Sequence, residues 1–103
     1  LFRSAPFDHG VKKMRYALMC TDKADALQTR LDNREAHLAY IAETGVVEMA
    51  GPLLDEAGKM IGSLVIIEVE TRADAEAWAT NDPYAKAGLF AKTRIEAWKK
   101  VIG

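Results

Sequence analysis

Four short apolar segments, each bounded by residues that favour turns, predict β-strands in this chain. The longest combines β-branched and aliphatic residues over about eleven positions, and Gly51-Pro52 closes the one before it. The predicted strands cover residues 16–20, 46–50, 60–70 and 91–101.

Between the first two strands, apolar residues recur at helical spacing and predict two helices, at about 23–31 and 33–44. Leu27 and Leu31 lie four positions apart, on one face of the first helix. Asp32 and Glu35 form a D-x-x-E capping box that predicts the start of the second helix. Gly45 then predicts its end, because glycine is favoured just after a helix.

A second pair of helices is predicted between the third and fourth strands. Thr71 is the expected N-cap of the first, which stops at Thr80-Asn81. Asp82-Pro83 starts the next, because aspartate is a favoured N-cap and proline suits the first helical position. Gly88 predicts the end of that helix.

This order of elements, βα(α)ββα(α)β, predicts the α+β class and a ferredoxin-like βαββαβ arrangement, with helices on one face of an antiparallel sheet. We expect one domain over residues 14–103. Residues 1–13 are expected to be an N-terminal tail or extension, either read-through sequence before a natural start at Met14 or a short targeting segment. His9 lies in this tail and is given no role.

The longest strand is apolar on both sides. Leu64 and Ile66 point one way and Val65 and Ile67 the other, because side chains alternate along a strand. Helices on one face of a sheet can cover only one of these sides. We therefore expect a homodimer in which a second copy packs against the other side. The alternative is that the N-terminal tail or the C-terminal segment folds over it.

The charge balance argues against two classes of partner. The net charge is −1 and the isoelectric point is about 6.1, so neither nucleic acid nor an anionic membrane is expected as the main partner. No apolar run approaches the roughly 18 residues of a membrane-spanning helix. The lone Cys20 excludes an intrachain disulfide and fits the reducing cytoplasm, which is the expected location.

One side of the predicted helix at 33–44 carries candidate chemistry. Arg34, His37, Leu38 and Ile41 recur at helical spacing, so the four residues share a side. We expect Leu38 and Ile41 to face the core, which would turn Arg34 and His37 toward an interior or a cleft. Histidine is suited to proton transfer near neutral pH, and arginine to binding an anion. The alternative is a histidine with a structural role and an arginine on the surface.

Three more polar residues are candidates for the same site. Asp82 can cap a helix, and its carboxylate could also orient an imidazole. Tyr84 could supply a hydroxyl group or pack in the core. Ser63 could donate to a ligand or serve a turn. Cys20 is expected to be a buried small apolar residue, and no spacing of ligands supports a metal site.

Several short motifs in a fixed order resemble the YciI-like (YCII-related) family, over residues 14–103. They are the D-K-x-x-x-L of 22–27, the R and R-x-x-H-L at 30 and 34–38, the A-G-P of 50–52, the G-S of 62–63, the A-x-A-W of 75–78, the D-P-Y of 82–84 and the A-G of 87–88. The resemblance implies a dimeric α/β barrel, formed by pairing two ferredoxin-like sheets. It also implies a site built on a His–Asp pair, here His37 and Asp82, with Arg34, Ser63 and Tyr84 beside it.

For function, the resemblance implies cofactor-free acid/base chemistry on small organic acids, as a lyase or an isomerase. Under this hypothesis His37 is the general base, Asp82 holds its tautomer, and Arg34 binds a substrate carboxylate. Whether the chain is an enzyme is left open by the sequence. The alternative is a non-catalytic dimer that binds a small ligand or another protein. A haem- or oxygen-using activity on the same barrel is a third reading, which no residue requires.

Overall fold

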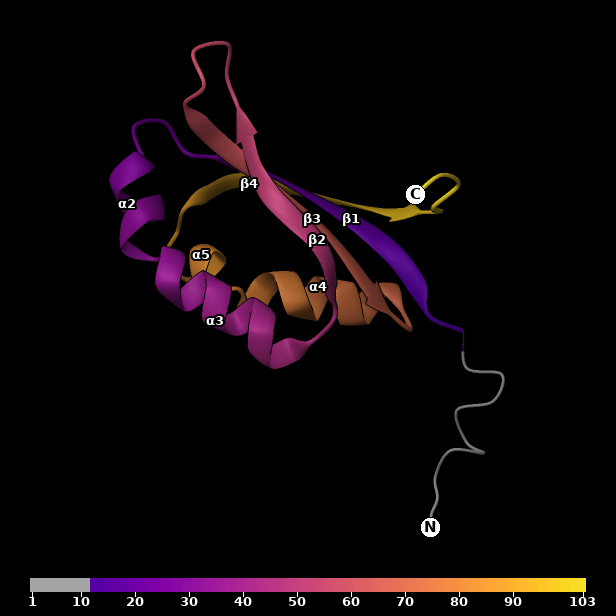
Figure 1. The fold of residues 1–103 in the computed structure, drawn as a ribbon. Coiled ribbons are helices and arrows are strands. Elements are labelled where there is room, and N and C mark those ends of the chain that lie inside the picture. Colours follow the sequence, from indigo (N-terminus) through magenta and orange to yellow (C-terminus); the bar gives the residue numbers. More distant parts are fainter. Residues whose placement is uncertain (1–11) are drawn as a thin grey trace.

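Strands and helices follow one another in the predicted order (Figure 1). The structure is a computed structural model, and it describes residues 12–103. Its elements are β1 (Met14–Asp22), α2 (Leu27–Asp32), α3 (Arg34–Thr44), β2 (Val47–Leu54), β3 (Met60–Val69), α4 (Arg72–Asn81), α5 (Pro83–Lys86) and β4 (Phe90–Trp98). The α+β class and the ferredoxin-like order are thus confirmed.

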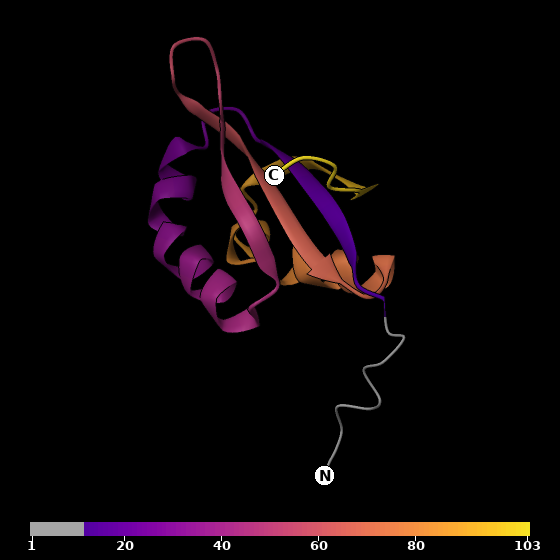
Figure 2. The same ribbon diagram turned by 45° about the vertical axis from the view of Figure 1, so that its right-hand side comes forward.

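The four strands form one antiparallel sheet in the order β2-β3-β1-β4. Leu18 at the centre of β1 lies opposite Val65 of β3 and Ile95 of β4. All the helices lie on one face of this sheet, and the turned view of Figure 2 shows the other face without a helix over it. This arrangement gives the sheet one covered face and one open face.

The core lies between the sheet and α4. Leu18 and Ile67 are fully buried there, and Ala75 and Trp78 pack against them from α4. Each such aliphatic side chain stabilises the fold by about 1.5–3 kcal/mol relative to full exposure. The sequence buries these residues because they fall on alternate positions of the strands and one turn apart on the helix.

A polar clamp joins α3 to α4. The indole N–H of Trp78 donates to the Thr44 hydroxyl at 2.9 Å, and the Tyr40 hydroxyl donates to the Trp78 carbonyl at 2.8 Å. The rings of Tyr40 and Trp78 also lie in contact, 4.9 Å apart between centroids. The clamp fixes the helix that carries His37 against the helix that leads to Asp82.

The open face of the sheet is apolar in its middle, as the alternation along β3 predicts. Leu64 is 36% exposed, and Met49 and Leu53 beside it on β2 are more exposed still. At one end of this face, the segment after β4 brings the ammonium of Lys100 within 3.6 Å of the Glu48 carboxylate on β2. The C-terminal segment therefore reaches one end of this face. Ile66, which shares the face, is only 4% exposed, whereas Leu64 stays accessible.

Several predicted boundaries are wrong. The first helix begins at Leu27, because residues 23–26 form a turn instead. The capping box is also wrong: Asn33 precedes α3, and no side chain caps the helix there. β2 continues through Gly51-Pro52 to Leu54, which an edge strand allows because the missing N–H of proline faces outward.

Both caps of the second helix pair are confirmed. The Thr71 hydroxyl accepts from the Asp74 N–H at 3.1 Å, and Asp82 accepts from the Tyr84 N–H at 3.0 Å. The last strand runs over Phe90–Trp98, so it ends before the predicted residue 101. The proposed tail, including His9, lies almost wholly outside the described residues. Within residues 12–103, none of the helices combines the length and the apolar character needed to cross a lipid bilayer.

Candidate functional site

His37 and Asp82 form a buried pair. The Nδ1 atom of His37 lies 2.8 Å from Oδ1 of Asp82, and the two residues are only 6% and 3% exposed. His37 comes from the inner side of α3. Asp82 sits at the N-cap of α5, where the same oxygen accepts the N–H of Tyr84. The cap fixes the carboxylate, and the carboxylate in turn fixes the imidazole.

This contact sets the tautomer of the histidine. An ionised carboxylate has no hydrogen to give, so it can only accept. Nδ1 of His37 therefore carries the hydrogen and donates it to Asp82, which leaves the lone pair on Nε2. An oriented imidazole with a free Nε2 is the arrangement of a general base.

Tyr84 packs flat against this imidazole. Its ring is stacked on that of His37, with 3.9 Å between centroids and an interplanar angle of 15°. The ring of Phe90 meets Tyr84 edge-on. Burial raises the pKa of the Tyr84 hydroxyl above its usual range, although the positive charges of Arg30 and Arg34 oppose this. At neutral pH the Tyr84 hydroxyl is therefore protonated, and its ring packs against one face of the His37 imidazole.

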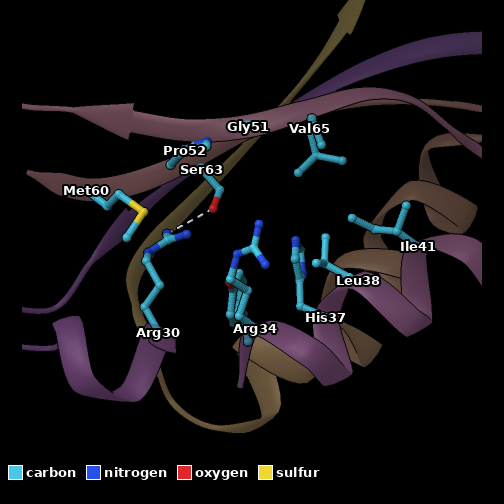
Figure 3. A pocket seen from close by; sticks show the side chains of 12 residues that line it. Arg30, Arg34, His37, Leu38, Ile41, Gly51, Pro52, Met60, Ser63 and Val65 are labelled. Atoms are coloured by element: carbon cyan, nitrogen blue, oxygen red, sulfur yellow. Dashed lines mark hydrogen bonds between the residues drawn. The ribbon is translucent and has the colours of Figure 1, made fainter. Parts of the chain in front are cut away.

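A second buried pair lies beside the first. Arg30 of α2 donates from Nε and Nη2 to the two carboxylate oxygens of Asp22, both at 2.8 Å. Nη2 also donates to Oγ of Ser63 on β3 at 2.9 Å (Figure 3). Burial opposes the charge on Arg30, but the hydrogen bonds and the charge of Asp22 outweigh it and raise the pKa of the guanidinium.

The sequence reasoning missed the roles of Arg30 and Asp22. Both appeared only as positions of a family motif, with no partner assigned. Their spacing of eight residues does not predict a contact, because a turn of irregular backbone separates the end of β1 from α2. One feature of the sequence could have indicated the pair: Arg30 lies between the apolar residues Leu27 and Leu31 of the predicted helix. An arginine that is buried there requires an anionic partner.

Arg34 lies at the mouth of the site. Its side chain extends from α3 into the space between Ser63 and His37, as Figure 3 shows. It is exposed, and it forms no ion pair with any residue from 12 to 103. The site therefore holds one cation whose charge is not compensated by the described part of the chain.

These side chains line a pocket of about 190 Å³ between the sheet and α3. Its polar wall comes from the helices and β3, and its apolar wall from α3, β2 and β3 (Figure 3). The lining residues are Arg30, Arg34, His37, Leu38, Ile41, Ala50, Gly51, Pro52, Met60, Ser63, Val65 and Tyr84. Four of the five predicted site residues line it, and the fifth, Asp82, holds His37 from behind.

One expectation about α3 is reversed. Leu38 was expected in the core, yet it is 44% exposed at the pocket, whereas His37 is the buried residue of the helix. The reason is the position of Asp82 and Tyr84, which lie in the core and draw His37 inward. Only Ile41 of the two apolar residues packs against the core.

Cys20 is buried, as expected, and lies outside this pocket. Burial raises the pKa of its thiol to about 11, even though the nearby Thr93 hydroxyl opposes the shift. The thiol is therefore protonated at neutral pH and is a poor nucleophile. Over the described range 12–103, no three His, Cys, Asp or Glu side chains come together in an arrangement that could hold a metal ion.

The sequence matches proteins of one family over most of its length. The model of the YCII-related domain matches residues 14–99. Protein YciI of Escherichia coli O6:H1 (strain CFT073) is 39% identical over 98 residues, which span 86% of this chain and 100% of the relative. An uncharacterised protein of Haemophilus influenzae is 36% identical over 99 residues, with the same coverage.

Solved structures add an enzyme with a similar fold. The 5-chloro-2-hydroxyhydroquinone dehydrochlorinase TftG of Burkholderia phenoliruptrix AC1100, in complex with 2,5-dihydroxybenzoquinone, superposes with a TM-score of 0.76 and 37% identity. The match covers 84% of this chain and 94% of that one. PA3566 of Pseudomonas aeruginosa gives a TM-score of 0.56 at 9% identity, with 87% and 95% covered, and so shares the fold alone.

Proposed function

This chain belongs to the YCII-related domain family, and from that premise we propose that it is a cofactor-independent enzyme that moves a proton on a small organic acid. The reaction class is elimination or isomerisation, that is, a lyase or an isomerase. The observation that carries the proposal is the buried His37–Asp82 pair, which leaves Nε2 of His37 free at a pocket. Arg34, uncompensated at the same pocket, supplies the charge that would attract an anion.

The proposed reaction begins at Nε2 of His37. This atom removes a proton adjacent to a carbonyl group, and the electron pair of the broken bond enters a new C=C bond of an enolate. The enolate then either expels a leaving group, which is elimination, or takes the proton back at another carbon, which is isomerisation. Asp82 stabilises the imidazolium that forms, because it lies 2.8 Å from Nδ1.

The size of the pocket limits the substrate. Sites for drug-sized ligands have volumes of about 300–1,000 Å³, so a pocket of about 190 Å³ suits a smaller molecule, of the size of one substituted ring or a short-chain diacid. The apolar residues on the wall opposite Arg34 favour a flat carbon skeleton. The dehydrochlorinase with the similar fold is named for a chlorinated aromatic substrate of this size, which supports the same class here.

The test is turnover of candidate substrates by the wild-type protein and by His37→Asn. We would assay 5-chloro-2-hydroxyhydroquinone and chlorinated or hydroxylated muconate-like acids, and follow chloride release and absorbance. Loss of the base is expected to lower kcat by about 10²- to 10⁴-fold. Turnover that is unchanged in His37→Asn eliminates the proposed base.

The dimer is part of the proposal. A second copy packed on the open sheet face would remove Leu64 and its apolar neighbours from water. This contact would also lie far from the helices, so it would leave the pocket accessible. The buried, unpaired Cys20 agrees with a location in the reducing cytoplasm.

A second candidate is a non-catalytic dimer that binds a small ligand or another protein. This candidate is favoured by the fact that Asp82 already has a structural role, as the N-cap of α5. On this reading, His37→Ala and Asp82→Ala each lower the melting temperature while no ligand raises it. A ligand-dependent rise in the melting temperature with no turnover identifies a binding protein, and turnover identifies an enzyme.

A further inference from the structure

The hydrogen of the Ser63 hydroxyl has no partner in the described chain. Oγ of Ser63 accepts from Arg30 Nη2 at 2.9 Å, and an arginine has donors only. The hydroxyl hydrogen must therefore be given to another group, and the structure offers no acceptor for it among residues 12–103. Ser63 is only 4% exposed, so bulk water does not readily serve it. Buried polar groups without a partner are rare and costly, which points to a partner that arrives with a ligand.

The direction of this hydrogen is set by the contacts of Arg30. Asp22 holds the guanidinium by two hydrogen bonds of 2.8 Å, and both side chains are buried. The ring of Tyr84 lies 4.9 Å from the guanidinium carbon, which further fixes its plane. Because Nη2 occupies one side of the serine oxygen, the O–H bond is turned away from Arg30. Figure 3 shows that oxygen at the edge of the pocket, on the strand above Arg34.

Arg30 and Arg34 therefore differ in role. The charge of Arg30 is neutralised by Asp22, so it attracts an anion weakly, whereas the charge of Arg34 is uncompensated by residues 12–103. The pocket thus presents one full positive charge, one neutral oriented hydroxyl and one base to the same small volume.

We propose that the Ser63 hydroxyl donates to an oxygen of the substrate on which negative charge develops, and that Asp22 and Arg30 are positioning residues for it. The substrate class is a compact carbonyl compound with a second, acidic oxygen; the acidic oxygen is ionised and held by Arg34, and the carbonyl oxygen is held by Ser63. This inference rests on the proposed function and deepens it. When Nε2 of His37 takes the proton, the electron pair forms the C=C bond and the carbonyl pair moves onto oxygen, where the serine stabilises it.

The test is binding of a coloured probe, because binding can be measured whether or not the protein turns anything over. The probe is 2,5-dihydroxybenzoquinone, which is flat, has the size of one ring and carries acidic oxygens. We would measure its Kd and its absorption shift with wild type, Ser63→Ala, Ser63→Thr and Arg30→Lys. Thr93→Val is the matched control, since its hydroxyl contacts Cys20 on the same side of the sheet but outside the pocket.

We expect Ser63→Ala to raise the Kd about 10- to 100-fold, the loss typical of a hydrogen bond to a charged group. Ser63→Thr keeps the hydroxyl and should restore most of the affinity. Arg30→Lys cannot hold Asp22 with two bonds and Ser63 at once, so it should weaken binding although the serine is present. In a variant that combines Ser63→Ala with Arg30→Lys, the two losses of affinity should not add, because Arg30 acts through Ser63. Thr93→Val should bind as wild type does.

The outcomes separate this inference from the proposed function. If Ser63→Ala binds the probe as tightly as wild type, or if wild type does not bind it at millimolar concentration, the inference is overturned. If His37→Asn loses turnover while Ser63→Ala keeps both its Kd and its kcat, the inference is wrong and the enzyme proposal stands. If the wild type turns over no substrate yet Ser63→Ala weakens binding of the probe, the hydrogen bond from Ser63 to a bound oxygen stands and the enzyme proposal fails. Should Arg30→Lys not fold, the two serine variants decide the matter.

Discussion

Asp82 binds the imidazole of His37 with the same carboxylate oxygen that caps helix α5, although the two residues are 45 positions apart. One group therefore joins the two halves of the fold, since His37 comes from the helix before β2 and Asp82 from the segment before β4. The structural and the chemical roles of Asp82 coincide at one atom, and a suitable variant can separate them.

Asp82→Asn is that variant. Asparagine caps helices about as well as aspartate, so the melting temperature should remain close to that of wild type. The neutral amide does not stabilise the imidazolium, so kcat should fall about 10²- to 10⁴-fold. Asp82→Ala, which loses the cap as well, should also melt earlier. Full activity in Asp82→Asn would assign the residue to folding alone.

Gly62→Ala should disturb the sheet beneath Ser63. A Cβ atom at this position would collide with the carbonyl oxygen of Cys20 on the neighbouring strand, and backbone cannot yield cheaply. We expect a loss of about 1–3 kcal/mol in the free energy of unfolding, measured by urea denaturation. Gly51→Ala is the control, because nothing lies within 4 Å of its added methyl group. Equal stability of the two variants would contradict the close approach of Gly62 to the Cys20 carbonyl.

Thr44→Val tests the clamp between α3 and α4. The valine has a similar shape but leaves the indole N–H of Trp78 without its acceptor, in a largely buried position. The free energy of unfolding should drop by about 1–3 kcal/mol. Thr80→Val removes an exposed hydroxyl that only bonds its own helix, so its effect should be far smaller. A similar loss in both would mean that the clamp adds nothing specific.

Cys20 should resist alkylation in the folded protein. With its pKa raised to about 11, only about one thiol in a thousand is ionised at pH 8, and the side chain is also buried. Because the pKa of the Cys20 thiol is raised, the thiolate fraction is lower than that of an ordinary cysteine at every pH below about 11. Mass spectrometry after iodoacetamide treatment should find the native protein unmodified and the guanidinium-denatured protein modified. Rapid native labelling would show that the strand opens.

Leu64→Glu should separate the subunits of the proposed dimer. The substitution places a charge in the middle of the apolar open face, where a partner sheet could not solvate it. Sedimentation at micromolar concentration should find a dimer for wild type and a monomer for the variant. Leu31→Glu, at a comparably exposed leucine on α2, should remain dimeric. A monomeric wild type would remove the dimer from the proposal.

Patterns within one segment predicted most of the fold. Alternation along β3 fixed which side chains share a face, and Thr71 and Asp82 marked helix starts because capping depends on a few adjacent residues. The capping box at Asp32 failed because Asp32 is still the last residue of α2, and Asn33 takes the position before α3 instead. Asp82 also follows a helix directly, but Pro83 after it favours the start of a new helix there.

The site was harder to predict, because its contacts cross between elements. Helical spacing singled out His37 and capping singled out Asp82, and the family resemblance then paired them. Helical spacing also placed Leu38 inside, and it underestimated the burial of His37. The pairing of Asp22 with Arg30 depends on the path of the turn after β1, which no spacing rule describes. A buried polar side chain must lie next to its hydrogen-bond partner, and in this site the partners come from different elements of the fold.

The position of β1 between β3 and β4 has a consequence during synthesis of the protein. β1 is synthesised before both of its neighbours, and one of them, β4, is the last of the four strands along the chain. Contacts between distant parts of a chain slow folding and leave strand edges free to pair wrongly in the meantime. A nascent chain that stops before Phe90 carries every residue of the pocket, yet one long edge of β1 stays bare. We therefore expect such fragments to aggregate rather than to fold.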